Sequence, residues 1–194
     1  MDSRERILKA VESSQRTGSA LADSFIRAAV EGDAAQKFID VLKNIGGVPV
    51  EVTSWEEIKK YIQLNWSDGK RIVSPVAELA DVSDHTKFSH DAHALHNVDL
   101  AIFQPHFGVA ENAAGWLTDD RMGDRALPFI TQHIALVIHR NDIVHTMHEA
   151  YDRIGVSNHT FGTFIAGPSK TADIEQSLVL GAHGPKSMTV FLLG

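Results

Sequence analysis

The sequence predicts an α/β fold with a mostly parallel sheet and helices on both faces. Short apolar segments alternate with amphipathic helical patterns along the chain, as in domains built around a parallel sheet. The run Ile134–Ile138 is apolar at every position, which is typical of a strand covered on both faces. A chain of 194 residues suits one such domain, so we expect a single α/β domain over residues 1–194, with residues 1–32 as a peripheral helical arm.

Periodicity and capping residues give the order of the expected elements. Helices are expected over residues 3–12 and 33–45, after the capping box of Ser54 and Glu57, after Asn141 or Asp142, and from Thr171. Strands are expected at residues 48–52, 71–73, 98–103, 113–117, 134–138, 161–166 and 188–193. Gly181 is expected to end the last helix.

Composition excludes several classes of function. A net charge of −7 argues against a nucleic-acid partner, which normally meets a basic surface. The absence of cysteine excludes disulfides, thiolate catalysis, iron–sulfur ligation and cysteine-based zinc sites in this chain. No segment approaches the roughly 20 apolar residues of a membrane span, and the N-terminus has no apolar leader. We therefore expect a cytoplasmic protein without a membrane span.

The segment 165–175, IAGPSKTADIE, is the first candidate site. As a strand, loop and helix it would present free backbone amides, and Ser169, Lys170 and Thr171 would add donors for a small anionic ligand. Gly167 and Asp173 complete this predicted anion-binding loop. The same residues also suit a plain capped turn, and this alternative stays open.

A second candidate site lies between two expected strands. Glu111 is a candidate general base, nucleophile or hydrogen-bonding partner of a ligand, and Asn112 is a candidate ligand contact. An exposed turn is the alternative. His183 and Lys186 follow the last expected helix and would close a mixed-charge pocket if their loop folds back toward Glu111. The histidine-rich stretch 84–96 matches no strong zinc spacing, so no metal site is predicted.

Several stretches together resemble one protein family. The segment GPSKTADIEQSLVLGAHGP, residues 167–185, closely resembles the C-terminal signature of the LUD-domain family of C-type lactate-utilisation proteins. Further similar stretches are SRERILKAV, KFIDVLKNIGGVPVEV, VAENAAGWL and LPFITQHIALVI. Where family members tend to have Glu-Thr-Gly, this chain has Glu111 followed by Asn112, so the carboxylate matches and the hydroxyl does not.

The resemblance implies a fold like that of ribose-5-phosphate isomerase, glucosamine-phosphate deaminase and CoA-transferases. It also implies a role in oxidising L-lactate to pyruvate beside cysteine-rich partner subunits that carry iron–sulfur clusters, with no cofactor bound by this chain. We therefore expect an accessory or substrate-binding subunit of such a complex. The alternatives are a free-standing enzyme acting on a phosphorylated sugar, a folate or an acyl-CoA through Glu111, and a ligand sensor without catalysis.

Overall fold

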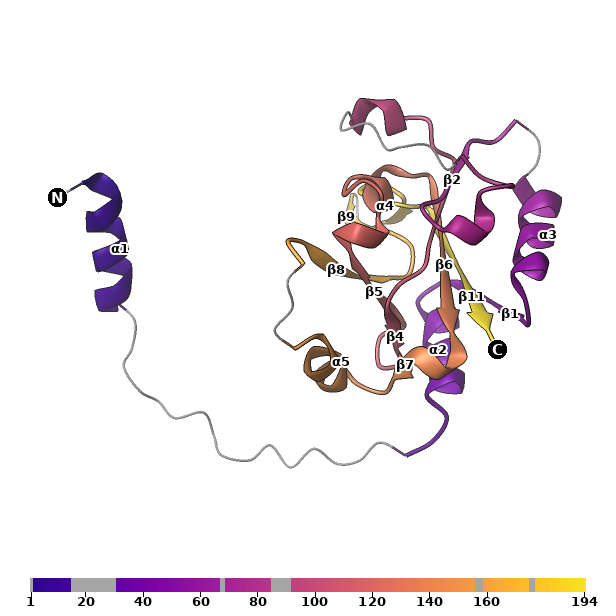
Figure 1. Ribbon diagram of the computed structural model, residues 1–194, viewed down its shortest axis with the longest axis horizontal. Helices are drawn as coiled ribbons and strands as arrows, with labels where there is room; N and C mark the ends of the chain where they lie inside the picture. The colour runs from indigo at the N-terminus through magenta and orange to yellow at the C-terminus, as the bar shows by residue number, and fades with distance from the viewer. Residues whose placement is uncertain (1, 15–30, 67–68, 85–91, 156–158, 175–176) are drawn as a thin grey trace. The chain divides into compact units, whose positions relative to one another are not determined.

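Five parallel strands form the central sheet in the computed structural model, which describes residues 2–14, 31–66, 69–84, 92–155, 159–174 and 177–194 (Figure 1). The strands are β1 (Val48–Val52), β2 (Ile72–Val73), β3 (Leu100–Phe103), β6 (His133–His139) and β11 (Ser187–Leu193). Their spatial order is β1-β11-β6-β3-β2, and each neighbouring pair is parallel. The predicted parallel sheet is confirmed.

A second sheet and a hairpin complete the β-structure of the described residues. The second sheet has the order β7-β4-β5-β8, and the separate hairpin pairs β9 with β10. The strands of the second sheet are β4 (Phe107–Val109), β5 (Ala114–Thr118), β7 (Ile143–Val144) and β8 (Gly162–Ala166). The hairpin consists of β9 (Lys170–Ile174) and β10 (Ser177–Leu180). The second sheet is mixed, since β4 is parallel to β7 and antiparallel to β5.

The helices belong to two compact units of the chain, Met1–Glu31 and Gly32–Gly194. The first unit contains α1 (Ser3–Ser14), in which no side chain is buried. The second contains α2 (Ala34–Asn44), α3 (Trp55–Trp66), α4 (Leu127–Ile130) and α5 (Met147–Ile154), and the short 3₁₀ turns η1 (Ala77–Leu79), η2 (Ala92–Leu95), η3 (Asp119–Arg121) and η4 (Arg140–Asp142). No helix in the part of the chain that the structure describes is long and apolar enough to cross a membrane.

Both faces of the central sheet are covered, as predicted. On one face, Ile58 and Ile62 of α3 and Leu79 of η1 pack against inward side chains of the strands. On the other face, α2 and the second sheet share a cluster that includes Phe38 and Leu117. The far side of the second sheet packs against α5 in a smaller cluster. The order of layers is therefore α3, central sheet, α2 with the second sheet, and α5.

Paired glycines allow the second sheet to approach the central sheet closely. Gly108 of β4 is the register partner of Gly115 of β5. A Cβ atom on Gly115 would lie 2.8 Å from Leu136 Cδ1 and 2.8 Å from Pro105 Cγ. We therefore expect Gly115→Ala to lower the free energy of unfolding by about 1–3 kcal/mol through overpacking, as measured by urea denaturation. A variant as stable as the wild type would contradict this close contact.

The predicted helix from Thr171 is wrong, because this segment is the β9–β10 hairpin. Thr171 pairs with Val179, and the amide of Gly181 donates to the carbonyl of Ser169 at 3.0 Å. The amide of Ser169 in turn donates to the carbonyl of Pro185 at 2.9 Å. These long-range bonds outweigh the local capping signal, and Gly181 lies at the open end of the hairpin instead of ending a helix.

The helix predicted after Asn141 or Asp142 begins later in the structure. Residues 140–142 form η4 and residues 143–144 form β7, which pairs with β4. The helix α5 starts at Met147 and is capped by the side chain of Thr146, which accepts from the amide of Glu149 at 3.2 Å. Residues 143 and 144, which the periodicity assigned to the first turn of the helix, are therefore paired in a sheet instead.

Candidate functional site

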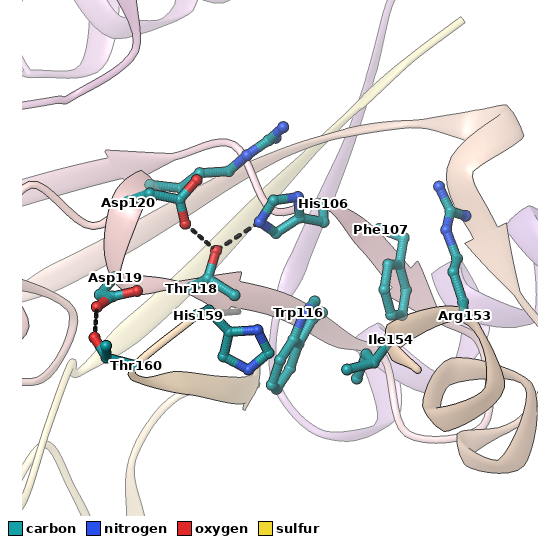
Figure 2. A pocket seen from close by; sticks show the side chains of 11 residues that line it. His106, Phe107, Trp116, Thr118, Asp119, Asp120, Arg153, Ile154, His159 and Thr160 are labelled. Carbon is teal, nitrogen blue, oxygen red and sulfur yellow. Dashed lines mark hydrogen bonds between the residues drawn. The ribbon is translucent and has the colours of Figure 1, made fainter. Parts of the chain in front are cut away.

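A pocket of about 760 Å³ lies on the far side of the second sheet from the central sheet. Its walls come from strands β4 and β5, the turn η3, the C-terminal part of α5, and His159 and Thr160 (Figure 2). This volume lies in the range that is typical of small-molecule sites. The pocket combines aromatic rings with several charged and hydrogen-bonding side chains.

The alternation of β5 places its outward side chains in the pocket. Trp116 and Thr118 line the pocket, whereas the intervening Leu117 belongs to the core cluster against the central sheet. The ring of Trp116 packs against His159, with 5.4 Å between the ring centroids. Gly162 makes this packing possible, because a Cβ there would lie 2.5 Å from Trp116 Cη2.

Three polar side chains form a hydrogen-bonded chain along one wall of the pocket. Thr118 Oγ1 lies 2.5 Å from Asp120 Oδ1 and 2.5 Å from His106 Nε2 (Figure 2). Thr118 is almost fully buried, with 3% of its surface exposed, so water does not compete for its hydroxyl. His106 follows β3, and its amide donates to the carbonyl of Trp116 at 2.9 Å. Its position is therefore fixed through both backbone and side chain.

The surroundings of His106 favour its neutral form. Burial lowers the pKa of its imidazole, and the nearby Arg121 lowers it further. Asp120 acts in the opposite direction, and His159 and Arg153 contribute smaller decreases. At neutral pH His106 is therefore an uncharged imidazole that can accept a proton or a hydrogen bond.

Arg121 is the cation of the pocket that lacks an acidic partner among the described residues. Its Nη1 donates to the carbonyls of Gln104 at 3.2 Å and Pro105 at 3.4 Å. Arg153, by contrast, donates to Asp142 at 2.9 Å and stacks over Phe107 at 4.8 Å from the ring centre. The guanidinium of Arg121 is thus held by neutral acceptors and keeps donors for an anion.

Asp119 anchors the opposite wall. Its Oδ2 accepts from Arg125 Nη2 at 2.8 Å and from the hydroxyl of Thr160. The hydrogen bond from Thr160, followed by that from Arg125, lowers the pKa of the Asp119 carboxyl. Because Thr160 lies two residues before the start of β8, these contacts tie the segment before β8 to η3.

A smaller pocket of about 160 Å³ lies at the carboxyl ends of β2 and β3, where parallel sheets commonly bind ligands. Its lining includes residues 75–78 and Gln104, and it shares Asp120 and Arg121 with the larger pocket. Arg121 therefore stands between the central sheet and the pocket on the second sheet.

Glu111 and Asn112 lie in the turn between β4 and β5. Glu111 Oε2 accepts from the amide of Met147 at 2.8 Å, at the first residue of α5. Asn112 Oδ1 accepts from the amide of Ala114 at 3.2 Å, and its Nδ2 lies 3.2 Å from Met147 Sδ. In the structure, then, both side chains hold the turn and the start of α5, and their predicted roles toward a ligand stay predictions.

The remaining predicted residues lie in or beside the β9–β10 hairpin. These are Gly167, Ser169, Lys170, Thr171, Asp173, His183 and Lys186. Lys170 lies beside the turn after α2, with its Nζ 3.3 Å from where a Cβ of Gly46 would be. His183 and Lys186 are exposed. The side chain of Asp173 and residues 85–91 of the histidine-rich stretch lie outside what the structure describes.

The structure brings together the loops at Gly167-Pro168 and Gly184-Pro185 but not the whole predicted site. Ser169 bonds to Pro185 across these loops. None of the predicted site residues lines the two pockets described above, within the part of the chain that the structure covers. Sequence reasoning missed His106, Thr118, Asp120 and Arg121. The available signal was the polar run Thr118–Arg121, which directly follows an expected strand.

Comparison with known proteins identifies related sequences. A family model described as the LUD domain matches residues 35–193. The lactate utilization protein C of Oceanobacillus iheyensis is 27% identical over 101 residues, which are 49% of this chain and 43% of that protein. The protein of the same name from Anoxybacillus flavithermus is 28% identical over 113 residues, 58% of this chain and 51% of that protein. The chain therefore spans about half the length of the curated relatives it matches.

A solved structure matches the fold. The crystal structure of a DUF162 family protein from Deinococcus radiodurans has a TM-score of 0.61 to this chain and 18% sequence identity. The match covers 86% of this chain and 100% of that chain. At this level of identity the likeness establishes the shared α/β architecture, and the chemistry of the site has to be argued from its own residues.

Proposed function

Because the chain belongs to the LUD domain family, with a match over residues 35–193, we propose that it serves lactate utilisation as the substrate-binding subunit of a cytoplasmic complex. Its relatives are named lactate utilization protein C, and these names support a role in lactate utilisation. The pocket at His106 and Arg121 supports a binding role, since Arg121 offers unpaired guanidinium donors for a carboxylate. This guanidinium, which has no acidic partner within the described ranges, is the observation that carries the proposal.

Oxidation of lactate to pyruvate removes two electrons and two protons, and this chain has no cysteine to hold an iron–sulfur cluster. The electrons would therefore pass to cysteine-rich partner subunits with iron–sulfur centres. In this arrangement the present chain binds and orients the acid, and the partners supply the oxidant. A three-carbon acid fills only part of a pocket of about 760 Å³, which leaves space beside it for a partner.

The same volume favours a second candidate function. A pocket of about 760 Å³ also suits a larger anion, such as a phosphorylated sugar, a folate or an acyl-CoA, turned over by the chain alone. Glu111 is the predicted base or nucleophile for that reaction, and its carboxylate accepts from the amide at the start of α5 and does not line the pocket. A ligand sensor would bind the same classes without turnover.

Thermal unfolding with a panel of anions separates these functions. L-lactate, pyruvate, acetate, inorganic phosphate, a sugar phosphate, a folate and CoA are each added to the purified chain. A ligand at 100 times its dissociation constant adds about 2.7 kcal/mol, which raises the melting temperature by several degrees. We expect the shift with lactate and pyruvate. A shift only with the larger anions would favour the second candidate, and no shift with either acid would contradict the proposed function.

A further inference from the structure

We infer that His106, held by Asp120 and Thr118, is the hydrogen-bond acceptor for the ligand's hydroxyl group, so that the pocket prefers a 2-hydroxycarboxylate to the matching 2-oxocarboxylate. This inference rests on the proposed function, because it assumes that the carboxylate lies at Arg121. It assigns a role in ligand choice to a residue that the sequence did not single out.

The hydrogen-bonded chain fixes where the proton of His106 lies. An ionised carboxylate has no hydrogen to donate, so the 2.5 Å contact between Thr118 and Asp120 uses the hydroxyl hydrogen of Thr118. Thr118 Oγ1 must then accept a hydrogen in its 2.5 Å contact with His106 Nε2. In a neutral imidazole only one nitrogen carries hydrogen, and therefore Nδ1 carries a lone pair.

The second nitrogen of His106 is available to a ligand. Within the described residues Nδ1 has no hydrogen-bond partner, and it is not among the buried atoms that lack one, so it is accessible. His106 also lines the pocket together with Arg121. A lone-pair acceptor and a guanidinium that has no acidic partner among the described residues match a ligand that has both a hydroxyl hydrogen and a carboxylate.

The charged groups around His106 set how this preference depends on pH. Arg121, Arg153 and His159 disfavour its protonation, whereas Asp120 favours it. While the ring is neutral, its lone pair attracts a hydroxyl and repels the oxygen of a keto group. Once acid protonates the ring, Nδ1 becomes a donor to either group, and the preference disappears. Because the pKa of His106 is lowered, the preference should persist through neutral pH and vanish on the acidic side of the usual histidine range.

Calorimetric titration with L-lactate and pyruvate between about pH 5 and pH 8 tests this preference. One neutral hydrogen bond contributes about 0.5–1.5 kcal/mol, so we expect lactate to bind about two- to tenfold more tightly than pyruvate at the upper end of this pH range. In His106→Phe the side chain keeps a ring but has no acceptor, so the ratio should approach one at every pH. A ratio that still favours lactate in that variant would overturn the inference.

The matched control is His139→Phe, because His139 is an exposed histidine at the end of β6, outside the pocket lining. It should keep the wild-type ratio and its pH dependence. Equal binding of the two acids by the wild type at every pH would overturn the inference and leave the proposed function intact. If neither acid binds, both fail.

Nitrogen-15 NMR of the labelled chain tests the proton position without any ligand. The wild type should show protonated Nε2 and unprotonated Nδ1 for His106 at neutral pH. Asp120→Asn supplies an N–H that can donate to Thr118, which frees the Thr118 hydroxyl to donate to Nε2 and should shift the proton to Nδ1. Thr118→Val should give a mixture of both forms. A wild-type spectrum with the proton on Nδ1 would overturn the inference.

Discussion

Phe38→Ala should lower the free energy of unfolding by about 3–5 kcal/mol, which is the largest effect on stability expected for this chain. Phe38 is fully buried in α2, inside the cluster that joins this helix to both sheets. Its Cε2 atom lies 3.1 Å from where a Cβ of Gly108 would be, so the ring fills the space that this glycine leaves. Removing the ring creates a cavity between three elements that cannot all move inward.

Urea denaturation followed by circular dichroism measures this loss. Phe129→Ala is the matched control, because Phe129 is 45% exposed in α4 and its ring contributes little to the core. The control should change the free energy of unfolding by about 0.5 kcal/mol or less. A loss of under about 1 kcal/mol for Phe38→Ala would mean that the second sheet is only loosely held to α2.

The central sheet was predictable because its strands can be recognised from their local sequence. Ile134–Ile138 is an unbroken apolar run, and the structure buries every residue of it between two layers. The helix expected over residues 33–45 likewise corresponds to α2, whose buried face includes Phe38 and Leu42. The family resemblance was also confirmed, since it depends on ordered similarity along much of the chain rather than on any one element.

The β9–β10 hairpin was not predictable from local signals. Ser169, Thr171 and Asp173 suit a helix N-terminus and an extended strand about equally in isolation. What decides between them is the pairing of Thr171 with Val179 and the bond from Ser169 to Pro185, both with partners further along the chain. A single sequence does not indicate which distant residues will pair.

The pocket was missed for a related reason. His106 follows β3, whereas Asp120 and Arg121 follow β5, and the sequence does not indicate that these segments meet. They meet because Phe107 of β4 is the register partner of Trp116, which places His106 beside the end of β5. The small neighbours of Glu111 suit the close approach of a ligand, but in the structure they form the turn from which its carboxylate accepts from the first amide of α5.

Arg121→Gln should weaken the binding of small carboxylates about 10- to 100-fold, which is the largest functional effect that we expect. Hydrogen bonds to a charged group contribute about 1.5–3 kcal/mol, and the variant removes the charge but keeps a polar side chain. The loss should apply equally to lactate and pyruvate, because both carry the carboxylate. Calorimetric titration at constant ionic strength measures it.

Arg140→Gln separates this local effect from a change in net charge. Arg140 lies in η4, outside the pocket lining, and is already paired with Glu51. Because screening limits long-range effects between exposed charges, its removal should change affinity by no more than about twofold at physiological salt. Arg153→Gln provides the opposing test, since Arg153 lines the pocket but is bonded to Asp142. If Arg153→Gln weakens the binding of both acids and Arg121→Gln does not, the carboxylate binds at Arg153 of α5. The lone pair of His106 must then contact a ligand that is held from the side of α5.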